Sequence, residues 1–174
     1  MSDSVPVTVN EFEAVFRGVN LPFGLTLDAV RVTAQKSSVS EHPFRVDFEN
    51  PGRVLATIGE GNLTTFLNAK SPGGLHDFEV KLDAGKLFIS ASVRVVVEVR
   101  ASAVCSLEIR DTKQIWVKLE QVEVLGVGAR RLVEKQLEKI NPVLDAAQIP
   151  LQIEFESATL SDGELIVVGR LTGI

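Results

Sequence analysis

The chain has 174 residues, of which 45% are hydrophobic, and it carries a formal net charge of −5. This length predicts one domain, residues 1–174, with a sizeable core, and the negative charge argues against sequence-independent binding of nucleic acid, which needs clustered Lys and Arg. No run of eighteen apolar residues is present that would span a bilayer, so the hydrophobic residues are distributed over amphipathic elements.

The first predicted elements are a short helix and a strand. A capping box beginning at Thr8 and apolar residues at helical spacing predict a helix over residues 9–17. The apolar alternation of residues 25–34 then changes phase near Ala29. This change requires a bulge or a twist in the strand.

Shorter elements separated by turn sequences follow. Alternating apolar residues predict strands over 44–48, 54–58 and 78–82, and a shared apolar face predicts a helix over 60–69. The sequence Asp-Ala-Gly at 83–85 ends the third of these strands. It predicts a hairpin into the next strand.

Residues 86–110 keep one alternation of apolar and polar side chains, interrupted on the polar side by Phe88 and Val96. We expect one strand of about fifteen residues, resumed after a short break, and such a strand would be roughly 50 Å long. Strands of compact domains are usually nearer to about 20 Å. The length therefore predicts a curved sheet that wraps around something apolar.

The last third of the chain predicts a return strand, the principal helix and a closing hairpin. A turn over residues 111–113 precedes a strand whose phase slips, which predicts a bulge near Glu120 or Gln121. Apolar residues at helical spacing predict a helix of about fifteen residues, entered through Gly126 and Gly128 and ended by Pro142.

The closing hairpin is predicted from strands over 151–155 and 165–171 joined by an Asp162-Gly163 turn. Strands and helices are segregated along the chain. The predicted fold class is therefore α+β with an antiparallel sheet.

Few residues carry a pattern typical of catalysis or metal binding. His42 and His76 have no second His or Cys at ligand spacing, so no metal site is predicted. Gly126-Val127-Gly128 lacks the third glycine of a dinucleotide loop and is better explained as the start of a helix. Glu154 and Glu156 share the polar face of a strand and are interpreted as solvated side chains. No cofactor and no enzymatic activity are predicted.

Two residues of the predicted strands have other interpretations. Cys105 is the one cysteine and lies in the apolar parity, where a free cysteine packs as a small hydrophobic residue. Trp116 lies on the outer parity and is either packed under a neighbouring helix or a dimer partner, or an anchor at a membrane interface. With Phe88 and Val96 it would form an outer apolar patch for a membrane or another subunit.

Four features together resemble one protein family. They are the phrase Ala56-Thr57-Ile58-Gly59-Glu60-Gly61-Asn62-Leu63, the strand pair through residues 82–87, the amphipathic helix before Pro142, and the tail over 151–171 with Ser161-Asp162-Gly163-Glu164-Leu165. The chain resembles the LmeA-like bacterial phospholipid-binding domains, which are related to tubular lipid-binding (TULIP, BPI-like) proteins. The resemblance implies a long, highly curved antiparallel sheet wrapped around a long amphipathic helix, short extra helices and an elongated acyl-chain cavity. It also implies a protein of the cell envelope without a catalytic motif.

The compartment is predicted separately from the first residues. Residues 1–6 lack a basic region followed by an apolar run, so the sequence as written predicts a cytoplasmic protein. If an export signal has been removed, the expectation becomes the cell envelope.

We therefore hypothesise that the domain binds, and transfers, a phospholipid or another lipid with acyl chains, with transient contact to a membrane. The alternative is a non-enzymatic interaction or scaffold domain with a filled core, such as a homodimer. The candidate cavity-lining residues are the apolar positions of the long strands and the helix: Leu87, Ile89, Val93, Val95, Val97, Leu107, Ile109, Val117, Leu132, Val133, Leu137, Ile153 and Phe155.

Overall fold

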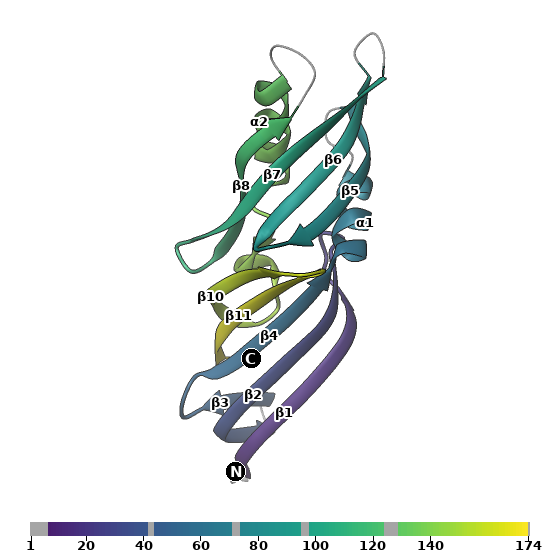
Figure 1. Cartoon of the computed structure of the whole chain (residues 1–174). Helices are drawn as coiled ribbons and strands as arrows, with labels where there is room; N and C mark the ends of the chain where they lie inside the picture. The colour runs from purple at the N-terminus through teal and green to yellow at the C-terminus, as the bar shows by residue number, and fades with distance from the viewer. Residues whose placement is uncertain (1–6, 42–43, 71–73, 95–97, 124–128, 174) are drawn as a thin grey trace.

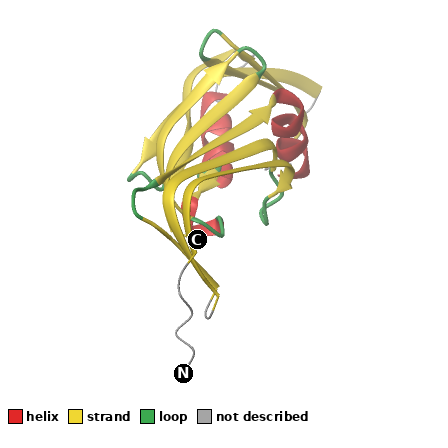
Figure 2. Cartoon of the chain, turned by 90° about the horizontal axis from the view of Figure 1, so that it is seen from below, coloured by secondary structure: helices red, strands yellow, loops and turns green. Residues whose placement is uncertain are grey.

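Two antiparallel sheets and two α-helices make up the chain in the computed structural model, which describes residues 7–41, 44–70, 74–94, 98–123 and 129–173. The sheets lie one above the other along the length of the molecule (Figure 1). Seen from the end, the strands curl around the helices, which lie on the concave side (Figure 2). The predicted α+β class with a curved antiparallel sheet is confirmed.

The larger sheet has six strands, and every described pairing in it is antiparallel. Its strands are β1 (Val7–Asn20), β2 (Thr26–Glu41), β3 (Phe44–Phe48), β4 (Gly52–Gly59), β10 (Gln152–Ser161) and β11 (Glu164–Gly173). Their order is β1-β2-β4-β11-β10, and β3 pairs with β2. The predicted closing hairpin is therefore confirmed as β10 and β11.

The smaller sheet has five strands in the order of the chain. They are β5 (Leu75–Asp83), β6 (Lys86–Arg94), β7 (Glu98–Arg110), β8 (Gln114–Glu123) and β9 (Leu144–Asp145). The hairpin predicted between β5 and β6 is confirmed, since Ala84 and Gly85 form its turn with φ values of 49° and 73°. The predicted bulge is confirmed too, because the register of β7 with β8 shifts between the partners Gln121 and Leu119.

The expected single long strand is wrong: the stretch folds into β6 and β7, which pair with each other from Leu87 with Cys105 to Arg94 with Glu98. The predicted residues Val95 and Val97, like Val96, fall in the segment 95–97 and lie outside the described residues. Paired residues of β6 and β7, such as Leu87 and Cys105, have the same parity in the sequence. The alternation of apolar and polar residues therefore continues from one strand to the other, and no break in the pattern marks the hairpin.

The predicted helix over residues 9–17 is also wrong, because this segment lies within β1 and pairs with β2 along its length. The burial of β2 changes phase between Leu27 and Val30, as predicted, and Gly18 of β1 has a φ of 61° at the same level. A change of phase within a strand spaces the apolar residues three and four apart. That spacing imitates the periodicity of a helix.

Helix α1 (Glu60–Lys70) confirms its prediction and protects the edge of β5. Glu60, Thr64 and Asn68 lie four residues apart and accept hydrogen bonds from alternate N–H groups of β5 at 2.7, 3.2 and 2.9 Å. The helix is tied to the other sheet as well, since Asp28 of β2 accepts a hydrogen bond from the Asn62 side chain at 2.9 Å. One helix therefore covers an open strand edge and joins the two sheets.

Helix α2 (Ala129–Ile140) ends before Pro142, as predicted, but it is not a long helix wrapped by the whole sheet. Its 12 residues give about 18 Å of length at 1.5 Å per residue. It packs against β8 of the five-stranded sheet (Figure 1). Asn141 fixes its end, because its side chain bonds the N–H and the C=O of Val117 at 2.8 and 2.9 Å.

Cys105 is fully buried on β7, which confirms its interpretation as a small hydrophobic residue. Burial, and secondarily the charge of Glu120, raises the pKa of Cys105 to about 12. The thiol is therefore protonated at neutral pH.

Candidate functional site

The inner face of the six-stranded sheet is built from apolar rows that cross the strands. Directly opposed residues of antiparallel strands share a face, so the register identifies the members of each row. The first row is Phe16, Val30, Ala56 and Val167, and the second is Ala14, Val32, Val54, Gly169 and Phe155. The small residues Ala14, Ala56 and Gly169 stand among larger ones in these rows, which leaves space above the sheet.

A cavity of about 330 Å³ lies over these rows. Its second wall is the connection around η2 (Ala146–Gln148), which follows β9. A side chain at Gly169 in its floor would be crowded, because a Cβ there would lie 3.1 Å from the carbonyl oxygen of Glu154. The lining residues are Phe16, Val19, Asn20, Leu21, Pro22, Leu27, Val30, Val32, Val54, Ala56, Leu144, Ile149, Pro150, Leu151, Ile153, Phe155, Val167 and Gly169.

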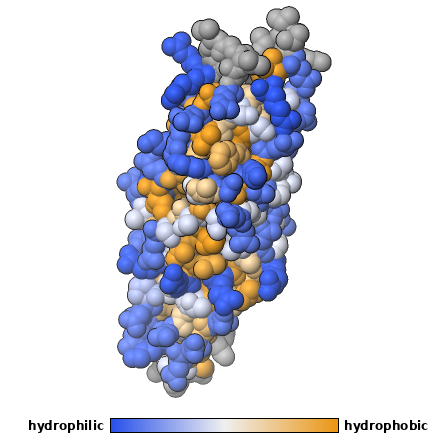
Figure 3. All heavy atoms as spheres, viewed as in Figure 1, coloured by the Kyte–Doolittle hydropathy of each residue, from blue (hydrophilic) through white to orange (hydrophobic). Residues whose placement is uncertain are grey.

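The mouth of the cavity lies between the two edges of the same curved sheet. Four lining residues are exposed, namely Phe16, Asn20 and Pro22 near β1 and Pro150 near β10. The floor is buried apart from Ala56, which is partly buried. Asn20 is the polar side chain of the lining, and its Oδ1 accepts a hydrogen bond of 2.7 Å from Thr26. Hydrophobic side chains also reach the surface where the two sheets meet (Figure 3). The site is therefore apolar inside and opens to the surface.

Two smaller hollows of about 40 Å³ each continue from the cavity under the five-stranded sheet. Leu144 lines both the large cavity and the first hollow, and Leu67, Ile89 and Ile140 line both small hollows. The three spaces are therefore neighbours in the molecule, and each shares lining residues with the next.

The candidate lining residues from the sequence divide among these spaces. Ile153 and Phe155 line the large cavity. Val93, 9% exposed, and the partly buried Ile109 belong to the core without lining any of the three spaces. The residues in the small hollows are Leu87, Ile89, Leu107 and Val117 in the first, and Ile89, Val133 and Leu137 in the second.

The side chain of Leu132, which lies in α2, is outside the described part of the chain. For the set as a whole, cavity lining stays a prediction.

The sequence-based candidates include few residues of the large cavity, because most of them were drawn from β6, β7, β8 and α2. The alternation of Val30, Val32, Val54 and Ala56 was visible, but the misread β1 removed the strand that completes the face. The phase change opposite Gly18 was the feature that could have identified β1 as a strand.

Charges lie on the outer face of the sheet, away from the cavity. Arg170 pairs with Glu154 across β11 and β10, and Lys113 lies 3.7 Å from Glu154. The hydrogen bond from Arg170, with its charge and that of Lys113, lowers the pKa of Glu154. Glu154 is therefore an ionised partner in a surface ion pair, in agreement with its interpretation as a polar-face residue.

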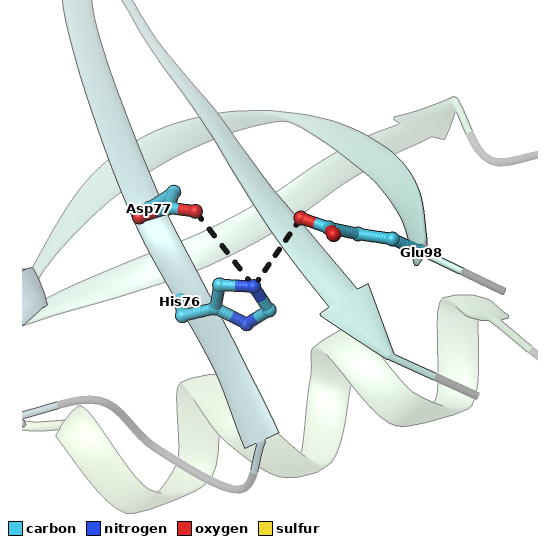
Figure 4. Close-up of side chains that lie close together, drawn as sticks. All are labelled: His76, Asp77 and Glu98. Atoms are coloured by element: carbon cyan, nitrogen blue, oxygen red, sulfur yellow. Dashed lines mark ion pairs between the residues drawn. The ribbon is translucent and has the colours of Figure 1, made fainter. Parts of the chain in front are cut away.

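His76 lies in a small group of surface ion pairs at the far end of the five-stranded sheet (Figure 4). Its Nε2 atom is 3.7 Å from Asp77 and 3.4 Å from Glu98. All three side chains are more than 40% exposed, and mutual pairing accounts for their positions. The second histidine, His42, lies outside the described residues.

Trp116 lies on the outer face under a charged neighbour. The guanidinium of Arg110 is 4.0 Å from the ring centre, and the indole N–H donates a hydrogen bond of 3.0 Å to Gln114. In the strand register, Ser106 and Lys118 come between Trp116 and Phe88 on this face. The described part of the expected outer patch is therefore not continuous.

A family model described as LmeA-like phospholipid-binding matches residues 45–170. The matched range includes β4 to β10 and most of β11, and it leaves out β1 and β2. Comparisons with curated proteins and with solved structures found no match. Among the described residues, no helix is long and apolar enough to cross a membrane.

Proposed function

Since the chain belongs to the LmeA-like phospholipid-binding family, we propose that it holds an acyl chain of a phospholipid in the 330 Å³ cavity of the six-stranded sheet. The observation that carries the proposal is the apolar lining, in which Asn20 at the mouth is the polar side chain. The volume falls within the range of about 300–1,000 Å³ that is usual for ligand sites.

The polarity of the cavity suits exchange of a lipid rather than its tight retention. Moving an acyl chain out of water is favourable by roughly 0.8 kcal/mol per methylene. A chain that leaves a bilayer gains little, because it starts in hydrocarbon. The proposed role is therefore to lower the barrier to lipid movement between membranes, and the polar head group stays at the mouth, near Asn20.

The small hollows under the five-stranded sheet extend the proposal. Side chains such as Leu144 separate them from the large cavity. Rotation of these side chains would lengthen the apolar space without moving the backbone. A longer acyl chain would then reach the residues that the sequence identified, including Leu107 and Val117.

The test places a large side chain inside the cavity. Ala56→Trp fills the space above the floor, whereas Thr57→Trp, its neighbour on the other face of β4, adds the same side chain outside. Purified proteins are extracted with organic solvent for mass spectrometry of bound lipid, and uptake of a fluorescent fatty acid is measured by titration. We expect Ala56→Trp to lose most of the bound lipid and of the uptake, and Thr57→Trp to keep both.

The contrary result has a clear meaning. If the wild-type protein carries no lipid and takes up no fatty acid, the scaffold interpretation with a filled core is favoured. If Ala56→Trp and Thr57→Trp bind equally well, a lipid is bound elsewhere than in this cavity.

A further inference from the structure

The inner face of β1 continues the apolar surface of the cavity out to the open edge of the sheet. Phe16 lines the cavity and is 53% exposed. Phe12, four residues earlier on the same face of the strand, is 37% exposed. Both lie opposite buried apolar residues of β2, namely Val30 and Ala34. The exposed rings therefore belong to the same face as the cavity floor.

The other face of β1 is polar at the same level. Glu13 forms an ion pair of 2.9 Å with Arg31 of β2, and both side chains are more than 50% exposed. Between Phe12 and Phe16 the residue on the inner face is Ala14, so that side carries no charge. The outer side of this part of β1 also carries Val15, which is 43% exposed and pairs with Arg31. The inner side is therefore apolar, and the outer side mixes charged residues with this one valine.

A lipid that passes between a bilayer and the cavity must cross this rim. Each methylene exposed to water on the way costs free energy, so the rim has to lie against the bilayer for the chain to pass without crossing water. Aromatic residues at such a rim enter the boundary between head groups and acyl chains. A net charge of −5 disfavours an anionic surface and points to a zwitterionic one.

We propose that the inner edge of β1, with Phe12 and Phe16 at its tip, is the surface by which the protein docks on a zwitterionic lipid bilayer, with the cavity mouth facing the membrane. The inference rests on the proposed function. It concerns a strand that lies outside residues 45–170, the range matched by the family model.

The test compares two exposed phenylalanines. Phe12→Asp places a charge on the proposed docking edge, and Phe88→Asp places the same charge on β6, where Phe88 is 39% exposed. Binding to phosphatidylcholine vesicles is measured by flotation, and transfer of a fluorescent phospholipid between vesicles is followed in parallel. Uptake of a monomeric fluorescent fatty acid from water reports on the cavity, which Phe12 does not line. Thermal unfolding of each variant confirms that it is folded. Phe12→Ser, which removes the ring without adding a charge, replaces Phe12→Asp if that variant is unfolded, and Phe12→Leu is the conservative control.

We expect Phe12→Asp to bind vesicles about tenfold more weakly or worse, because one desolvated Phe side chain contributes roughly that factor, and to transfer phospholipid correspondingly more slowly. Uptake of the fatty acid should be unchanged, Phe88→Asp should behave as wild type, and Phe12→Leu should keep vesicle binding. Equal vesicle binding by wild type and Phe12→Asp would overturn the proposal. A wild-type dimer that Phe12→Asp dissociates would overturn it too, because a second copy of the chain would then cover the edge of β1. Absence of fatty-acid uptake by the wild type would refute the proposed function while vesicle flotation still decides the docking surface.

Discussion

The contact between α1 and the edge of β5 allows a quantitative prediction for Asn68→Ala. The Asn68 side chain accepts a hydrogen bond from the N–H of Phe78 at 2.9 Å and donates one to its C=O at 3.0 Å. β5 is an edge strand, so these backbone groups have no partner strand on that side. Removal of the amide therefore leaves both groups to water at a partly buried position.

The expected loss is about 1–3 kcal/mol for two hydrogen bonds of about 0.5–1.5 kcal/mol each. Alanine is the better helix former by roughly 0.5 kcal/mol, which offsets part of the loss. The net prediction for Asn68→Ala is a decrease of about 1–2 kcal/mol in the free energy of unfolding. Thr65→Ala, at an exposed position of the same helix, should stay within about 0.5 kcal/mol of wild type.

Urea unfolding followed by circular dichroism measures the stability, and hydrogen exchange of the Phe78 amide measures the local effect. The exchange of this amide should become faster in Asn68→Ala beyond the change in global stability. If Asn68→Ala is as stable as the wild type and its Phe78 amide exchanges at the wild-type rate, α1 does not protect the strand edge.

Three further predictions concern two buried positions. Because burial raises the pKa of Cys105 to about 12 from 9.0, the folded protein should react with a thiol reagent at pH 8 far more slowly than the urea-unfolded chain. The same shift implies that its contribution to stability is complete below pH 9 and is lost as the pH rises from 9 toward 12, which alkaline unfolding with Cys105→Ala as the reference would show. Gly52→Ala should destabilise the six-stranded sheet by about 1–3 kcal/mol, since the new Cβ would lie 2.9 Å from the carbonyl oxygen of Thr33; an unchanged melting temperature would contradict this.

Local patterns predicted the elements whose ends are marked by turn residues. The hairpin at Ala84-Gly85, the closing hairpin through Asp162-Gly163 and the bulge beside Glu120 each follow from a short stretch of sequence. In each case the phase of the alternation and the turn residues agree. Such consistency made these parts of the fold predictable.

The parts that were not predicted depend on pairing between distant segments. The β6–β7 hairpin preserves the parity of its apolar residues, so no break marks its turn. The cavity depends on small residues such as Ala56 and Gly169 that meet only when β4 and β11 are side by side. Free space is a property of this three-dimensional arrangement, and hydrophobic alternation alone does not distinguish it from a filled core.

The position of a bound acyl chain can be measured directly by fluorescence, because the chain has one tryptophan, Trp116, on the outer face of β8. Phe155→Trp combined with Trp116→Phe moves the fluorophore into the cavity wall. A fatty acid brominated along its chain should quench this variant strongly and the wild-type protein weakly. Equal quenching of the two proteins, or none in the variant at saturating fatty acid, would contradict a lipid site in the cavity of the six-stranded sheet.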